Sequence, residues 1–328
     1  HQYHEDPAGY VNRDTVRVVA DVGATNTRLA LFDEATAEFH AVGTFVNRDY
    51  PRLQDVVSRW LGEQDITPTR ACIAIASPLA GDHISMVNMD WHFSRSAFAE
   101  ETGLATVTWI NDFVANAYAL PYLAASERTE LHPGTPGGLE KLAAIGPGTG
   151  LGGATVQHTA EGWLANACEP GHAGLSPANA IELAVFDALL GEYDNIYTEL
   201  LVSGPGLQRL YRTLAVVTNR DAAELSPADI SGRALAGEDP LCVESLELFC
   251  ALLGSACGDF LLSTGARDGL YLAGGIVPRM VPFLRSSSFH QRLCSKGAMG
   301  PVLQQVPVYV VTAAQPGLIG AAHAPLAD

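Results

Sequence analysis

The sequence predicts an α/β protein of two domains that share one plan and face each other across a cleft. Its 328 residues are the usual length of about two domains. A strand–glycine turn–strand unit occurs twice, at residues 16–32 and 141–158. After each unit, strand and helix patterns alternate along the chain, which is typical of α/β folds.

The first half begins with a β-branched run at residues 16–21, followed by a first glycine turn at residues 23–26. Two further strands are expected at 27–32 and 39–46, and the short connections predict antiparallel pairing. The remaining first-half elements are a Pro-started helix at 51–61, a strand at 70–76, a helix at 93–102 and a strand at 106–110. Because helices separate these later strands, we expect them to be parallel.

The second half repeats this beginning, with a strand at 141–145, a second glycine turn at residues 146–153 and a strand at 154–158. Five helices are then expected. The expected elements after the turn are strands at 162–167, 269–273 and 308–311, and helices at 178–190, 206–214, 227–235, 241–264 and 317–322.

Charge and lysine content exclude several functions. The formal net charge is −17, and only Lys141 and Lys296 are lysines. Duplex nucleic acid and a polybasic membrane anchor are therefore not expected as partners, since both depend on clustered Lys and Arg. Neither lysine lies in a Walker A loop. A phosphorylated ligand would have to be bound mainly without lysine.

The six cysteines form no C-x-x-C pair, so free thiols in a reducing cytoplasm are expected. The longest apolar stretch, residues 248–262, is short for a membrane span and predicts a buried helix. His1 is not an initiator methionine, so residues 1–12 are left out of the fold prediction.

Both glycine turns are candidate phosphate sites. Successive N–H groups in such a turn form an anion-binding concavity, and Thr25 adds a hydroxyl. Asp21, at the end of the preceding strand, is suited to hold the water shell of a metal ion. An ordinary turn with an exposed Asp is the alternative. The second turn contains G-x-G-x-x-G from Gly148, but a strand and not a helix follows, which argues against a Rossmann site.

Other polar and glycine residues stand at strand ends or in glycine-rich segments. Gly274-Gly275 ends a strand and offers a flat surface to a base or ribose. Asn111-Asp112 ends another, where α/β sheets bind ligands, although a helix N-cap is an equal alternative. Further candidates are Glu169, His172 and Glu199.

In combination, these positions resemble the group A bacterial glucokinases, within the superfamily of hexokinases, actin and chaperone ATPases. The resemblance covers about residues 16–322. Nine short motifs occur in family order: Asp21-x-Gly23-x-Thr25-Asn26, Ser77-Pro78-Leu79-Ala80-Gly81, Asn88-Met89-Asp90-Trp91, Ile110-Asn111-Asp112-Phe113, Gly146-x-Gly148-Thr149-Gly150-Leu151-Gly152, Glu169-x-Gly171-His172, Ser203-Gly204-Pro205-Gly206-Leu207, Ala273-Gly274-Gly275-Ile276-Val277-Pro278-Arg279 and Pro316-Gly317-Leu318-x-Gly320.

The resemblance implies two ribonuclease-H-like domains of the actin-like ATPase superfamily flanking a cleft. The small domain would hold residues 1–110 and about 306–328, and the large domain 111–305. It implies a sugar site at Asn111, Asp112, Glu169, His172 and Glu199, with Ser77 and Pro78 beside it. It implies phosphate loops at Ala20, Asp21, Val22, Gly23, Ala24 and Thr25, and at Gly148, Thr149 and Gly150, with Gly274 and Gly275 near the nucleotide.

The implied reaction is phosphoryl transfer from ATP to the 6-hydroxyl of glucose, with Asp112 as general base and Mg²⁺ held through water by Asp21. Two residues depart from the pattern of many relatives: Ala24 replaces a glycine, and Pro170 replaces another. Ala24 accepts only a negative φ comfortably, so the first loop is expected to differ slightly from that of relatives. Pro170 lacks an N–H, so any contact from that amide is lost.

Several alternatives remain. Another hexose could be the acceptor, and polyphosphate or another nucleotide the donor. An actin-like or chaperone-like ATPase shares the glycine turns but gives no reason for the polar cluster. A sugar-sensing regulator would need a DNA-binding module before residue 16. The ROK sugar kinases carry a cysteine cluster after the equivalent of His172, and here the next cysteine is Cys242. The expected partners are the sugar and ATP, with a possible homodimer.

Overall fold

A computed structural model describes residues 12–86 and 89–327, so Asn88 of the third motif lies outside the described residues. The chain divides into two compact units. The first comprises His1–Glu127, Gly162–Ala165 and Ala313–Asp328, and the second Arg128–Glu161 and Asn166–Thr312.

The first unit contains a five-stranded sheet in the order β3-β2-β1-β4-β7. Its strands are β1 (Val16–Val22), β2 (Asn26–Asp33), β3 (Glu38–Val46), β4 (Arg70–Ile75) and β7 (Thr106–Asn111). β1, β2 and β3 are antiparallel neighbours, whereas β4 and β7 run parallel to β1. The predicted pairing directions in this half are therefore confirmed.

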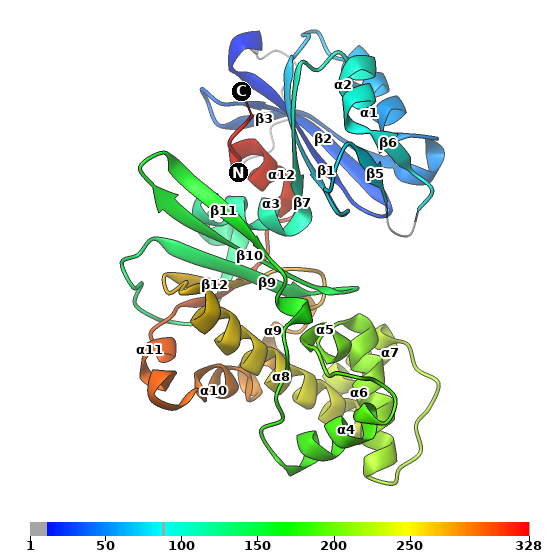
Figure 1. The fold of residues 1–328 in the computed structure, drawn as a ribbon, viewed down its shortest axis with the longest axis vertical. Coiled ribbons are helices and arrows are strands. Elements are labelled where there is room, and N and C mark those ends of the chain that lie inside the picture. Colours follow the sequence, from blue (N-terminus) through cyan, green and yellow to red (C-terminus); the bar gives the residue numbers. More distant parts are fainter. Residues whose placement is uncertain (1–11, 87–88, 328) are drawn as a thin grey trace. The chain divides into compact units, whose positions relative to one another are not determined.

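Helices cover both faces of this sheet (Figure 1). α1 (Leu53–Gly62) and α2 (Arg95–Thr102) share a core with one face, while α3 (Asp112–Ala119) and α12 (Pro316–His323) pack together on the other. A two-stranded sheet, β5 (His83–Ser85) and β6 (His92–Ser94), precedes α2. The predicted helix therefore begins later than expected, after Ser94 accepts the Ala97 N–H as its N-cap.

The second unit repeats the plan of the first and adds one strand. Its sheet order is β11-β10-β9-β12-β13-β8. The strands are β8 (Arg128–His132), β9 (Lys141–Pro147), β10 (Leu151–Thr159), β11 (Gly162–Cys168), β12 (Gly269–Leu272) and β13 (Val308–Val311). β9 pairs antiparallel with β10 and parallel with β12, as β1 does with β2 and β4.

Helices of the second unit gather around α8 (Pro240–Thr264), which is buried along most of its length. By length and composition α8 could cross a membrane, yet 83% of its apolar window is buried inside the protein. Gly254 and Gly258 let it approach the backbone of α10 closely. The other helices are α4 (Ala180–Leu190), α5 (Thr198–Leu201), α6 (Gly204–Val217), α7 (Pro227–Ala236), α9 (Val281–Ser286), α10 (Phe289–Cys294) and α11 (Gly300–Gln304).

Seven short 3-10 helices complete the described secondary structure. They are η1 (Arg13–Thr15), η2 (Asn47–Asp49), η3 (Leu120–Tyr122), η4 (Ala125–Glu127), η5 (Pro170–His172), η6 (Val277–Arg279) and η7 (Gly297–Met299).

The expected domain boundaries of 110/111 and 305/306 differ from this division in three places, at residues 111–127, 162–165 and 306–312. β13 was expected in the small domain, but it pairs with β12 and β8 and so belongs to the sheet of the second unit. Residues 111–127 were expected in the large domain, but α3 packs against α12 in the first unit. Asn111 and Asp112 therefore belong to the first unit.

Candidate active site

Predicted site residues of the first unit lie at one edge of its sheet. β1, β4 and β7 are parallel, and the register places Val22 opposite Ile75 and Ile75 opposite Asn111. Asp21, Asn111 and Asp112 therefore stand at the carboxyl ends of neighbouring strands, which is where open α/β sheets bind ligands.

The first glycine turn (residues 23–26) is held by its own backbone and by Asn47. The Gly23 N–H donates to the Asn26 carbonyl at 2.9 Å. Asn47 is 1% exposed; its Nδ2 donates to the Gly23 carbonyl at 2.8 Å, and its Oδ1 accepts from Thr27 Oγ1 at 2.7 Å. Sequence reasoning missed Asn47, because an Asn just after a strand carries no sign that its side chain turns inward.

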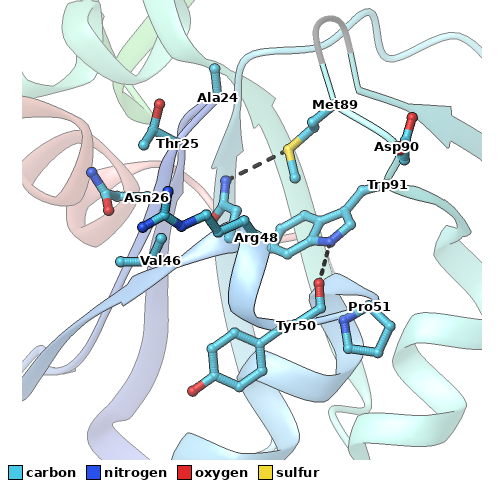
Figure 2. A pocket seen from close by; sticks show the side chains of 11 residues that line it. Ala24, Thr25, Asn26, Val46, Arg48, Tyr50, Pro51, Met89, Asp90 and Trp91 are labelled. Atoms are coloured by element: carbon cyan, nitrogen blue, oxygen red, sulfur yellow. Dashed lines mark hydrogen bonds between the residues drawn. The ribbon is translucent and has the colours of Figure 1, made fainter.

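Beside this turn lies a cavity of about 710 Å³ (Figure 2). The Trp91 indole closes part of it by donating to the Tyr50 carbonyl at 3.0 Å. Ala24 is not among the non-glycine residues found with a positive φ, so its replacement of glycine does not strain the turn. The lining residues are Ala24, Thr25, Asn26, Val46, Asn47, Arg48, Tyr50, Pro51, Met89, Asp90 and Trp91.

Asp21 is the most perturbed carboxylate among the described residues. Its side chain is only 24% exposed and lies 4.0 Å from Arg28 Nη1. Burial raises the pKa of Asp21 to about 6; Arg28 opposes the rise and Asp112 adds to it. A Cβ on Gly317, at the start of α12, would lie 2.7 Å from the Asp21 carboxyl carbon. The Pro316–Gly317 motif thus makes room for this carboxylate, a role that sequence reasoning did not assign.

The partly buried Asp21 carboxylate has Asp112 as an acidic neighbour and Arg28 at 4.0 Å. Such a surplus of negative charge suits a divalent cation. The described residues contain no group of three or more ligating side chains. Mg²⁺ commonly keeps most of its waters and uses one or two carboxylates with substrate phosphates. The donor set at Asp21 therefore fits Mg²⁺ held through water.

Asn111 and Asp112 are both at the N-terminus of α3, as the helix-cap alternative predicts. Asn111 Oδ1 accepts from the Val114 N–H at 2.7 Å, so Asn111 is the N-cap. Asp112 is exposed, and its Oδ1 accepts from the Phe113 N–H at 3.0 Å. The cap leaves the Asn111 amide nitrogen and the exposed Asp112 carboxylate as groups that a ligand can contact.

Ser77 and Pro78 follow β4 at the same sheet edge. Ser77 is buried, and its hydroxyl donates to the Ser85 carbonyl at 2.9 Å. This proton is therefore committed to the protein, and the hydroxyl oxygen can serve a sugar only as an acceptor.

The second glycine turn (residues 146–153) joins β9 to β10 in the second unit. Its tip is closed by the Gly148 N–H donating to the Gly150 carbonyl at 2.8 Å. A Cβ at Gly146 would collide with the Ala273 carbonyl, and a Cβ at Gly274 would lie 2.8 Å from the Pro147 carbonyl oxygen. The motif at residues 273–279 therefore packs directly against the base of this turn.

Glu199 and His172 lie beside the same turn. Glu199 Oε1 accepts from the Leu151 N–H at 2.7 Å, and Glu199 Oε2 lies 3.8 Å from His172 Nε2. The His172 ring stacks on Tyr197, with centroids 5.4 Å apart. The structure thus brings two of the predicted sugar residues together with the predicted phosphate turn of this unit.

Pro170 occupies the first position of η5, immediately after Glu169. A helix does not use the N–H at its first position, so proline is tolerated there. The ring fills space over Gly153, where a Cβ would lie 2.6 Å from Pro170 Cγ. The departure from Gly at this position is therefore accommodated within the unit.

Both lysines serve the framework of the second unit. Lys141 Nζ donates to the Thr264 carbonyl at 2.5 Å, and Lys296 Nζ lies 2.7 Å from Asp259 Oδ1. The second glycine turn consequently depends on backbone N–H groups for any positive potential that a lysine would otherwise supply.

Comparison with known proteins decides the family. The glucokinase family model matches residues 18–327. The chain belongs to the glucokinase family. A glucokinase from Chromobacterium violaceum is 42% identical over 314 residues, covering 95% of this chain and 89% of that protein. A glucokinase from Colwellia psychrerythraea is 37% identical over 314 residues, covering 94% and 95%.

Solved structures agree with this glucokinase assignment. The crystal structure of a glucokinase from an Antarctic psychrotroph is 38% identical with a TM-score of 0.87, covering 94% of this chain and 98% of that chain. A ROK family glucokinase from Streptomyces griseus, solved with glucose and AMPPNP, shares the fold at 20% identity and a TM-score of 0.59, covering 94% and 98%. The predicted family and fold class are confirmed.

Proposed function

We propose that this enzyme of the glucokinase family transfers the γ-phosphoryl group of ATP to the 6-hydroxyl of D-glucose. The reaction class is inferred from family membership, which extends over nearly the whole chain. The observation that carries the residue assignment is the placement of Asp21 and Asp112 at one sheet edge beside the first glycine turn.

We assign sugar binding to polar groups of both units. Asn111, Asp112 and the Ser77–Pro78 segment contribute from the first unit, and Glu169, His172 and Glu199 from the second. Carboxylates accept from sugar hydroxyls, the Asn111 amide donates, and His172 can donate or accept.

We assign phosphate binding to the two glycine turns, at Ala20–Thr25 and Gly148–Gly150, with Gly274 and Gly275 near the nucleotide. Bound at Asp21 through water, Mg²⁺ would supply neutralisation of phosphate charge. Asp112 accepts the proton of the attacking hydroxyl. A carboxylate is a weak base, but proton removal can be late in a loose phosphoryl transfer, where positioning supplies most of the catalysis.

The test is ADP release with and without sugar. We expect release that depends on glucose and Mg²⁺, with mannose, fructose and glucosamine run in parallel to rank the acceptors. ADP release that is equal without any sugar would favour the ATPase alternative. Full turnover in excess chelator would contradict the metal assignment.

We also propose a cytoplasmic homodimer. All six cysteines are free, which fits a reducing compartment. Light scattering tests the oligomer, because a dimer has twice the chain mass of 34.7 kDa. A particle of single-chain mass across a range of concentrations would overturn the dimer.

A further inference from the structure

We propose that Glu199 is a positioning residue for the second glycine turn as well as a sugar-binding residue. Its carboxylate would then couple sugar binding to nucleotide binding inside the second unit. The binding of sugar and nucleotide at these residues rests on the proposed function, whereas the positioning role of Glu199 rests on contacts within the unit.

The two oxygens of the Glu199 carboxylate face different partners. Oε1 accepts from the Leu151 N–H at 2.7 Å, at the point where the turn becomes β10. Oε2 lies on the His172 side, 3.8 Å from Nε2. With 30% of the side chain exposed, the group is fixed on one side and open to a ligand on the other.

Two glycines from different motifs make room for the pairing of Glu199 with Leu151. A Cβ at Gly150 would collide with Glu199 Oε1, and a Cβ at Gly171 would lie 2.5 Å from the Leu151 carbonyl oxygen and 3.3 Å from Glu199 Cβ. The hydrogen bond to Leu151 is therefore part of how the turn is packed.

The segment that carries Glu199 holds the turn at a second point. The Gly204 N–H donates to the Gly148 carbonyl at 2.7 Å. Ser203 links the two contacts, since its hydroxyl donates to the Glu199 carbonyl at 2.8 Å and accepts from the Gly206 N–H at 3.0 Å. A displacement of Glu199 is consequently transmitted to both sides of the turn.

Coupling follows from this shared carboxylate. A sugar hydroxyl that orders Glu199 also orders the acceptor of the Leu151 N–H, and therefore the turn that faces the phosphates. By linkage, nucleotide bound at the turn favours sugar binding by the same factor.

The test measures AMPPNP binding with Mg²⁺ and without sugar, by titration calorimetry. Glu199→Ala removes the acceptor, so we expect affinity to fall about tenfold, the usual effect of losing a hydrogen bond to a charged group. Glu199→Gln keeps an oxygen acceptor, so its affinity should stay within about twofold of the wild type. Glu192→Ala is the matched control, because Glu192 is an exposed carboxylate of the same unit to which no site is assigned, and its affinity should also stay within about twofold of the wild type.

A second measurement reads the contact directly and needs no ligand. Hydrogen exchange at the Leu151 amide should accelerate about tenfold or more in Glu199→Ala and stay slow in Glu199→Gln and Glu192→Ala. Unchanged exchange in Glu199→Ala, or equal AMPPNP affinity in Glu199→Ala and Glu192→Ala, would overturn the positioning role. Absence of glucose turnover in the wild type would instead overturn the proposed function and leave the exchange result standing.

Discussion

The two glycine turns have the same place in the two repeated sheets but are held by different means. The first is fixed by its own backbone and by Asn47, two strands further along the chain. The second is fixed by Glu199, Gly204 and Gly274, which lie about 50 to 125 residues away in the sequence. Sheets of the same plan thus carry the proposed phosphate turns with local support in one unit and long-range support in the other.

This difference predicts which property a substitution in each unit should change. In the first unit, the turn stands next to the carboxylates assigned to the reaction. In the second unit, the turn packs directly against a residue assigned to sugar binding and against segments that are distant in the sequence. Changes in the first unit should therefore affect turnover most, and changes in the second should affect binding and folding together.

The largest effect is expected from Asp112→Ala. Loss of the proposed general base should lower kcat by about two to four orders of magnitude, while sugar binding partly survives. Glu169→Ala in the second unit is the comparison, and it should act mainly on KM for glucose. Steady-state kinetics measures both parameters. Near-normal kcat in Asp112→Ala would contradict the proposal that Asp112 acts in turnover and Glu169 in sugar binding.

The second effect is on the folding of the second turn. Gly146→Ala forces a Cβ against the Ala273 carbonyl, so the free energy of unfolding should fall by about 3 kcal/mol. Gly148→Ala is the matched control, because no atom lies within 4 Å of its added Cβ. Urea unfolding measures both variants, and equal midpoints would show that the turn does not depend on the 273–279 segment.

The third effect concerns the support of the first turn. Asn47→Ala leaves the buried Thr27 hydroxyl and the Gly23 carbonyl without their partner, which should cost about 2 kcal/mol. Ser203→Ala, which removes a helix N-cap beside the second turn, should cost about 1 kcal/mol. If Ser203→Ala lowered the free energy of unfolding more than Asn47→Ala did, the first turn would not depend on the Asn47 side chain.

The smallest effect is a pH dependence that each unit carries through one histidine. Burial, aided by Arg17, lowers the pKa of His323 to about 4 in the first unit. Burial, aided by His132, lowers the pKa of His290 to about 4 in the second. Since an unfolded histidine has a pKa of about 6.5, the unfolded chain binds more protons between pH 6.5 and 4. The contribution of these histidines to the free energy of unfolding should therefore be complete above pH 6.5 and fall as the pH drops towards 4.

The measurement is the difference between wild type and variant in thermal unfolding at pH 7 and pH 5. His323→Phe keeps a ring to stack on Tyr122, and it should remove about 1 kcal/mol of the acid loss after allowance for solvent exposure. Asp21 contributes with the opposite sign. Its pKa is raised to about 6 in the folded protein, so its contribution to the free energy of unfolding rises as the pH falls. A variant that lost as much stability on acidification as the wild type would contradict the assignment.

Much of the fold could be predicted from local sequence. The repeated strand–turn–strand units, the pairing directions and the long α8 follow from residue type and periodicity. β8 was missed because Arg128–His132 is a short, half-buried edge strand without an apolar run. The domain boundaries were misplaced because the sheet that receives β13 is decided by long-range pairing, which periodicity does not report.

The residues of the candidate site could be proposed from the sequence, but their contacts could not. Residue type and position at strand ends made Asp21 and Asp112 candidates. The bond from Leu151 to Glu199 spans 48 residues and depends on two glycines that make room for it. Gly317 beside Asp21 comes from the opposite end of the chain. Such contacts arise only once the units have folded.

The return of the chain to the first unit at residue 313 has a consequence for synthesis. α12 covers the face of β1 and β4, and Arg17 Nη1 donates to the Ala324 carbonyl at 2.6 Å. On the ribosome, residues 128–312 take on the order of ten to forty seconds to appear at usual elongation rates. During that time the nascent first sheet lacks its last helix and shows an apolar face that a holding chaperone would recognise. The part of the enzyme made first is therefore the part completed last.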